Sequence, residues 1–296
     1  MTPEEIGIIV LILITFVAAI VNGGLGYGFS STAVPILLLF FLNRILNPAI
    51  VLLEIVINFY ILILHWAQVR LIIKKVYPIL ISAIPGVLVG AWLLAFVDSA
   101  WIKMVTFSLL LPLILLQAGG IRMPIQSEKM AYTFLGAGVG FFYAVTTVSG
   151  PPLAVFLNNQ GLVKKEFRAA LGIIRLSLAI MTAASYYFLG LYQGESLNLL
   201  TTMVPSVLIG IPIGTYLIRK MDPETFRRVC MSFDVWFVGF GLSRVMIQLD
   251  ILKSPYAYSV LVLAILIDIR LLYRYFTSAK SVSIPIGESL KNESGT

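Results

Sequence analysis

Long apolar stretches separated by short polar connections fill almost the whole of this chain. Most of the stretches approach the roughly 20 residues that an α-helix needs to cross a bilayer core. Two glutamates precede the first stretch, so we interpret it as a retained membrane segment and not as a cleavable signal peptide. The stretches are 6–21, 30–42, 48–69, 76–97, 101–118, 130–145, 151–160, 168–190, 198–218, 226–248 and 256–275.

Composition agrees with a membrane protein. Of the 296 residues, 59% are hydrophobic and 12% are charged, whereas soluble domains carry about 25% charged residues. Because only helices or closed barrels satisfy the backbone inside lipid, and the apolar runs have helical length, we expect an all-α polytopic membrane protein. The bilayer is therefore its first predicted partner.

The net charge of +7 does not indicate a nucleic-acid partner. The Lys and Arg residues gather in short connections such as 70–75 and 219–228, as they do in cytoplasmic loops. A single cysteine and a single histidine exclude an internal disulfide and a Cys- or His-rich metal cluster. The chain also lacks a phosphate-binding loop and a nucleophile elbow, so we expect no enzyme and no cofactor.

A repeat is visible at an offset of 120 residues. It predicts a first membrane repeat at 1–125 and a second at 126–250, followed by an extra C-terminal transmembrane helix at 251–276 and a flexible cytoplasmic tail at 277–296. Two runs rich in Gly, Ser or Thr, 22–28 and 146–150, also fall together under this shift. The matched residues are Ala49 and Ala169, Pro85 and Pro205, Gly90 and Gly210, and Gly119 and Gly239.

Loop charge predicts the orientation of the two repeats. The basic connections 70–75, 119–129, 161–168 and 219–228 are placed in the cytoplasm, and the connections 98–100 and 190–197, without Lys or Arg, outside. The hairpin 6–42 then has both ends outside, and the hairpin 130–160 has both ends inside. This predicts two inverted repeats, each a broken-helix hairpin plus three transmembrane helices, with the N-terminus outside and the C-terminus cytoplasmic. Inverted repeats are typical of secondary transporters.

The two breaks are the predicted substrate site. A helix that begins after a break presents free N–H groups and a partial positive charge, which together attract an anion. The alternative is that the glycines only allow close helix packing. The candidate substrate-binding residues of the first break are Asn22, Gly24, Gly26, Gly28, Ser30 and Ser31, and those of the second are Ser149, Gly150 and Pro151.

Charges inside the apolar stretches are the next candidates, because a charge at mid-helix costs about 2.5–3.5 kcal/mol on insertion scales. Arg175 is a candidate ligand for an oxyanion. Glu54, with Asn58 one turn later, is a candidate for gating or for proton coupling. A structural ion pair between Glu54 and Arg175, which are 121 residues apart, is the alternative. Asp234 and Asp268 are weaker candidates of the same kind.

These residues resemble the sulfite exporter TauE/SafE family over about residues 8–248. The resemblance implies a multi-pass permease with about seven to nine segments that moves sulfite, sulfoacetate or other organosulfonates. The matching runs are Gly23-Gly24-Leu25-Gly26-Tyr27-Gly28, Val34-Pro35, Val148-Ser149-Gly150-Pro151-Pro152-Leu153, Gly161-Leu162, Glu166-Phe167-Arg168-Ala169 and Pro223-Glu224-Thr225-Phe226-Arg227.

The sequence therefore predicts a secondary transporter that moves a small organic or inorganic anion, such as sulfite or an organosulfonate, across the cell membrane. Proton coupling is one version of this mechanism. A passive anion channel and a non-transporting scaffold subunit are the alternatives. The expected partners are the anion and the lipid bilayer, and a homo-oligomer is compatible with both. The expected location is the inner membrane of a bacterial or archaeal cell.

Overall fold

A computed structural model describes residues 3–64, 66–119, 128–150, 152–153, 157, 164–220 and 223–282. Within these ranges the chain forms helices and no strand, and eight of the helices are long and apolar enough to cross a membrane. The prediction of an all-α polytopic membrane protein is confirmed. The helices are α1 (Pro3–Leu25), α2 (Phe29–Leu37), α3 (Asn43–Leu64), α4 (Trp66–Phe96), α5 (Ser99–Ala118), α6 (Glu128–Thr146), α8 (Lys164–Phe188), α9 (Gly194–Leu217), α10 (Pro223–Gln248), the 3₁₀ helix η1 (Tyr256–Tyr258) and α11 (Ser259–Val282).

The predicted connection at 70–75 is wrong, because α3 ends at Leu64 and α4 already begins at Trp66. The basic residues Arg70, Lys74 and Lys75 lie in the first turns of α4, and all three are exposed. Lys and Arg are good helix formers whose long apolar stems lie along a helix while the charged ends reach water. Their presence therefore does not stop a helix, and it obscured the true boundary.

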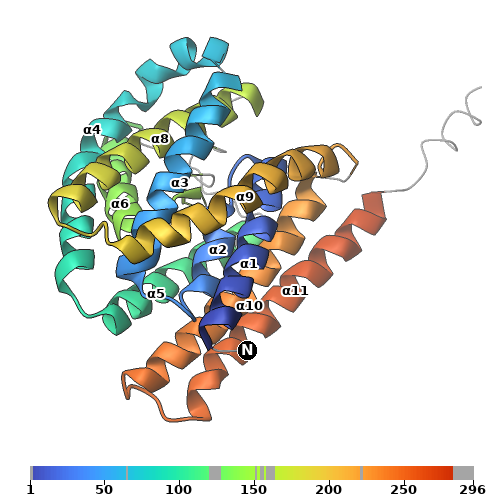
Figure 1. The fold of residues 1–296 in the computed structure, drawn as a ribbon. Coiled ribbons are helices and arrows are strands. Elements are labelled where there is room, and N and C mark those ends of the chain that lie inside the picture. The colour runs from blue at the N-terminus through green and yellow to red at the C-terminus, as the bar shows by residue number, and fades with distance from the viewer. Residues whose placement is uncertain are drawn as a thin grey trace, which may run out of the picture.

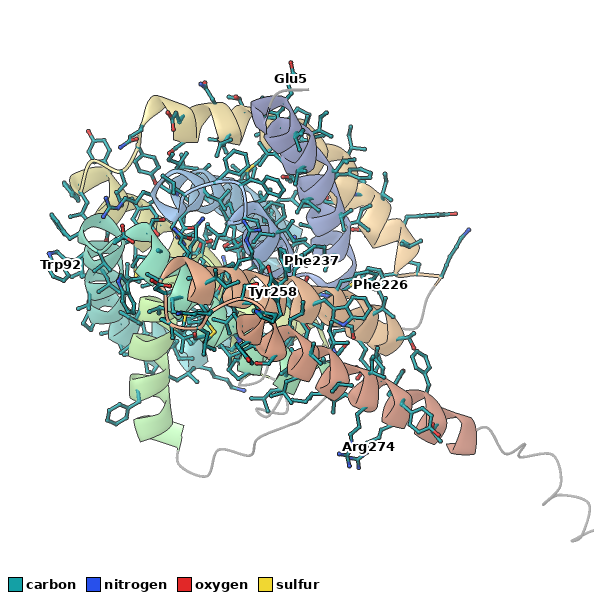
Figure 2. All side chains as sticks on the ribbon, turned by 90° about the horizontal axis from the view of Figure 1, so that it is seen from below. Glu5, Trp92, Phe226, Phe237, Tyr258 and Arg274 are labelled. Atoms are coloured by element: carbon teal, nitrogen blue, oxygen red, sulfur yellow. The ribbon has the colours of Figure 1, made fainter. Side chains whose placement is uncertain are left out.

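The first break is shorter than the predicted 22–28. Helix α1 continues to Leu25, so Asn22 and Gly24 lie in its last turns, and only residues 26–28 are non-helical. Glycine is tolerated at the end of α1 because another helix comes close there: a Cβ added to Gly24 would lie 2.9 Å from the Phe226 ring. Figure 2 shows Phe226 beside the end of α1.

Close packing through glycine joins helices that are far apart in sequence. α4 lies along α6, and a Cβ added to Gly90 would stand 2.6 Å from the carbonyl oxygen of Phe141. α1 lies along α9, where a Cβ added to Gly210 would stand 2.6 Å from the Cβ of Ala19. Backbones approach this closely only where small residues face one another.

These contacts correspond under the 120-residue offset. The offset places α9 at the position of α4, and α6 at that of α1, so the pairs α4–α6 and α9–α1 are equivalent. The first helix of each predicted half thus packs against a helix of the other half. α2 is buried along its whole length, and Figure 1 shows α11 along the outside of α10. The domain boundaries and the opposite membrane orientation of the halves stay predictions.

The outer surface is apolar, as a lipid-facing surface is. Large hydrophobic side chains are exposed on every long helix of the described chain, Trp92 and Ile267 among them. Figure 2 shows Trp92 on one flank of the molecule and Arg274 projecting from another. The interior, in contrast, holds buried polar and charged groups, which is the arrangement expected when function lies inside a helix bundle.

Candidate functional site

The first break consists of residues in backbone conformations that favour glycine. Gly26 has φ +81° and Gly28 has φ +103°, which side-chain-bearing residues rarely adopt. Gly28 is the N-cap of α2, and no side chain caps this helix. Ser30 and Ser31, two of the candidate substrate-binding residues, lie in the first turn of α2, where they are buried. The Ser31 hydroxyl donates back to the Gly28 carbonyl at 3.1 Å.

The second break stores local strain. Thr147 has φ +58°, which is unfavourable for a β-branched residue. The hydroxyl of Thr146 steadies the turn, since it donates to the Phe142 carbonyl at 2.7 Å and accepts from the backbone N–H of Val148 at 3.1 Å. Ser149 is fully buried, and its hydroxyl has no protein partner within the described chain. Pro151 lies outside the described residues.

The two breaks meet inside the protein. A Cβ added to Gly150 would lie 3.2 Å from the Tyr27 ring and 3.6 Å from the backbone nitrogen of Gly28. The first break therefore lies directly beside Gly150, where the second break ends, although 122 residues separate Gly28 from Gly150 (150 − 28 = 122). Helical geometry resumes at Gly150, so two chain segments turn into helices at one place.

A buried ion pair joins the middle of α3 to the middle of α8. A guanidinium nitrogen, Nη2, of Arg175 lies 2.8 Å from Oε1 of Glu54, and the two side chains are 1% and 0% exposed. Tyr143 on α6 donates its hydroxyl to the other carboxylate oxygen at 2.8 Å. Asn58 donates to the Glu54 backbone carbonyl at 2.8 Å. Thus both oxygens of Glu54 accept hydrogen bonds, as an ionised carboxylate does.

Several buried polar atoms near these elements have no protein partner in the described chain. In addition to the Ser149 hydroxyl, they include Nε and Nη1 of Arg175, Oδ1 of Asn22 and Oδ1 of Asn58. Buried polar atoms are almost always hydrogen-bonded in folded proteins, and a guanidinium without partners on two nitrogens is the most costly of these. These donors and acceptors are therefore candidates to bind a polar molecule.

Two further carboxyl groups are buried in α10 and α11, and they differ in their partners. Asp234 accepts one hydrogen bond at Oδ2, from the Thr32 hydroxyl at 3.2 Å, and its Oδ1 has no partner. Asp268 accepts from Ser232 at 2.9 Å and from the Trp236 ring at 3.1 Å, one bond on each oxygen. Neither forms an ion pair with a cation of the described chain.

Three residues of this region were not identified from their own chemistry in the sequence. Tyr143 and Thr32 are ordinary polar residues in apolar segments, and their acidic partners are 89 and 202 residues away. Arg168 was singled out only by the family resemblance, yet its side chain borders the first break. Its Nε lies 3.7 Å from the position of a Cβ added to Gly26.

The fold and this interior define a class: a multi-pass α-helical membrane protein whose interior holds buried charged residues and two helix breaks that lie against each other. A family model for the sulfite exporter TauE/SafE matches residues 11–240, so the chain belongs to this family. Membership implies a membrane transporter of sulfur-containing anions. The comparisons with curated proteins and with solved structures find no match.

Proposed function

We propose that this protein is a secondary transporter that moves a small sulfur-containing anion, sulfite or an organosulfonate, and binds it where the two breaks meet. The observation that carries the proposal is Arg175. Its guanidinium is 1% exposed, uses one nitrogen for Glu54, and leaves Nε and Nη1 without a partner in the described chain. A sulfonate or sulfite presents several oxygens that suit this planar set of donors.

The helix ends strengthen the same attraction for an anion. The first N–H groups of α2 follow Gly28 without a side-chain cap, and the Ser149 hydroxyl at the second break is an additional donor. The residues predicted to bind substrate, from Asn22 to Ser31 and from Ser149 to Pro151, would form the walls. Because the polar side chains of the proposed site, Arg175 and Ser149 among them, are buried, the anion enters and leaves through a change of conformation, as alternating access requires.

In this proposal Glu54 acts as a gate on the anion site. Its carboxylate is a tethered anion that occupies one side of Arg175, and Asn58 fixes the turn of α3 that carries it. A substrate oxyanion would compete with Glu54 for the guanidinium, and the ion pair would close again after release. In this proposal the Glu54–Arg175 ion pair has both roles that the sequence left open: it joins the two halves, and it opens when substrate binds.

Purified protein in liposomes tests the proposal against sulfite, methanesulfonate and acetate. The double variant Arg175→Gln/Glu54→Gln removes both charges without leaving one unpaired, and Arg270→Gln, at an exposed position on α11, is the matched control. We expect saturable sulfite or sulfonate flux in the parent and control, and its loss in the double variant. Unchanged flux in the double variant would remove Arg175 from the site, and flux that never saturates would indicate a channel.

A further inference from the structure

We infer that Asp234 is the protonation site that couples anion transport to the movement of a proton, an inference that rests on the proposed anion site. Asp234 lies near the middle of α10 and is 1% exposed. Its Oδ2 accepts from Thr32, in the first turn of α2, and its Oδ1 has no partner in the described chain. The carboxyl group is therefore beside the helix end that the anion would approach.

Among the residues that the structure describes, none supplies a compensating positive charge to Asp234. α1, α2, α5 and α11 all pack against α10. α2 carries no titratable residue, and Cys230, one turn before Asp234 on α10, carries no positive charge. The charged groups on these helices already have partners or are exposed. Lys103 on α5 donates to the Leu38 carbonyl, Arg227 and Arg228 pair with Glu224, and Asp268 accepts from Ser232 and Trp236. The exposed charged residues are Glu5, Arg244, Arg270 and Arg274.

A buried carboxyl group without a cation is held in its neutral form, since ionising it away from water is far more costly than binding a proton. Glu54 is the opposite case, because a guanidinium and a tyrosine hydroxyl hold its carboxylate. Of the two carboxyl groups next to the breaks, Asp234 is the one that can take up and release a proton without dismantling the site.

Coupling follows from the position of the charge. When Asp234 is ionised, its negative charge lies one turn from the start of α2 and opposes the attraction of that helix end for an anion. When a proton from the water on one side joins the carboxylate, this opposition disappears and the anion binds more tightly. Release of the anion and of the proton on the other side restores the starting form. Binding of the proton favours binding of the anion, and binding of the anion favours binding of the proton, as thermodynamic linkage requires.

The test uses methanesulfonate, whose single charge does not change across the working pH range, in liposomes that contain the purified full-length protein. We expect the parent to bind it about tenfold more tightly in mildly acidic than in mildly alkaline buffer, a coupling of ordinary size. A pH gradient with the acidic side outside the liposomes should drive its accumulation inside them. Asp234→Asn should exchange methanesulfonate across the membrane at equal pH, but should lose both the pH dependence of affinity and accumulation driven by the gradient. Asp268→Asn, the matched control, should retain all three.

The outcomes separate the two proposals. A parent protein that exchanges neither sulfite nor sulfonate refutes the transport proposal itself. Accumulation driven by the gradient in Asp234→Asn overturns the inference while leaving the anion site intact. If Asp234→Asn proves inactive in exchange as well, Thr32→Val decides. Loss of its hydrogen bond to the ionised carboxylate should move the pH midpoint of binding upward, and an unmoved midpoint overturns the inference.

Discussion

Glu54 and Asp234 are both fully buried carboxyl groups near the junction of the breaks, but they have opposite surroundings. Glu54, between α3 and α8, has a guanidinium on one oxygen and a phenol on the other. Asp234, between α10 and α2, has a single hydroxyl at 3.2 Å. The comparison teaches that burial alone does not define a carboxyl group in a membrane interior. Its partners decide whether it serves as a fixed charge or as a proton carrier.

Arg175→Ala should cause the largest loss of stability, because it leaves Glu54 buried without its cation. Removing one partner of a buried ion pair costs about 3–5 kcal/mol. We expect the thermal unfolding midpoint in detergent to fall accordingly, and Glu54→Gln in the same chain to recover much of the loss. If Arg175→Ala alone were as stable as the parent, the burial of the Glu54 carboxylate would not depend on Arg175.

Tyr143→Phe should have the next largest effect. It removes one hydrogen bond to a charged carboxylate, and such bonds contribute about 1.5–3 kcal/mol. The unfolding midpoint should fall by less than in Arg175→Ala. Tyr186→Phe is the comparison variant, since the Tyr186 hydroxyl donates to the neutral carbonyl of Ala144. If both phenylalanine variants lose the same stability, the charge on Glu54 contributes nothing to the bond.

Thr32→Val should cost about 1 kcal/mol, the ordinary contribution of a hydrogen bond between neutral groups. The valine side chain fills the same space, so packing between α2 and α10 is preserved. Chemical denaturation in a mild detergent, followed by intrinsic tryptophan fluorescence, measures the difference. A loss as large as that of Tyr143→Phe would mean that Thr32 bonds to an ionised Asp234.

Asp234→Asn should have the smallest effect on stability, less than about 1 kcal/mol, because a neutral amide replaces a neutral acid of the same shape. The same unfolding assay should place this variant close to the parent in acidic buffer. Glu54→Gln sharpens the comparison, since that change leaves the Arg175 guanidinium buried without its carboxylate. Equal losses from the two amide substitutions would erase the distinction between the carboxyl groups.

The sequence predicts the helices well because membrane helices are long and apolar, whatever their neighbours. It fails where a local signal is ambiguous. The basic residues at 70–75 indicated a loop, but they are compatible with a helix whose lysines reach water, and α4 contains them. The glycines at 23 and 24 indicated a break, but they serve the contact of α1 with α9 and α10.

The candidate site was predictable only in part, for a similar reason. Charges stand out in apolar segments, so Glu54, Arg175 and Asp234 could be found by inspection, and the pairing of the first two was one of two alternatives. Their neutral partners could not be found. Thr32 and Asp234 are 202 residues apart, and nothing local distinguishes a threonine that binds a carboxyl group from one that caps a helix.

The packing of α1 on α9 also sets an order of events during synthesis of the protein. The Thr215 hydroxyl donates to the carbonyl of Gly23, 192 residues earlier. In the same contact between α1 and α9, Gly210 packs against Ala19. At about 5–20 residues per second, the first helix waits roughly 10–40 s in the membrane before its partner leaves the ribosome. In a chain truncated before α9, the face of α1 that carries Gly23 would lack this packing partner.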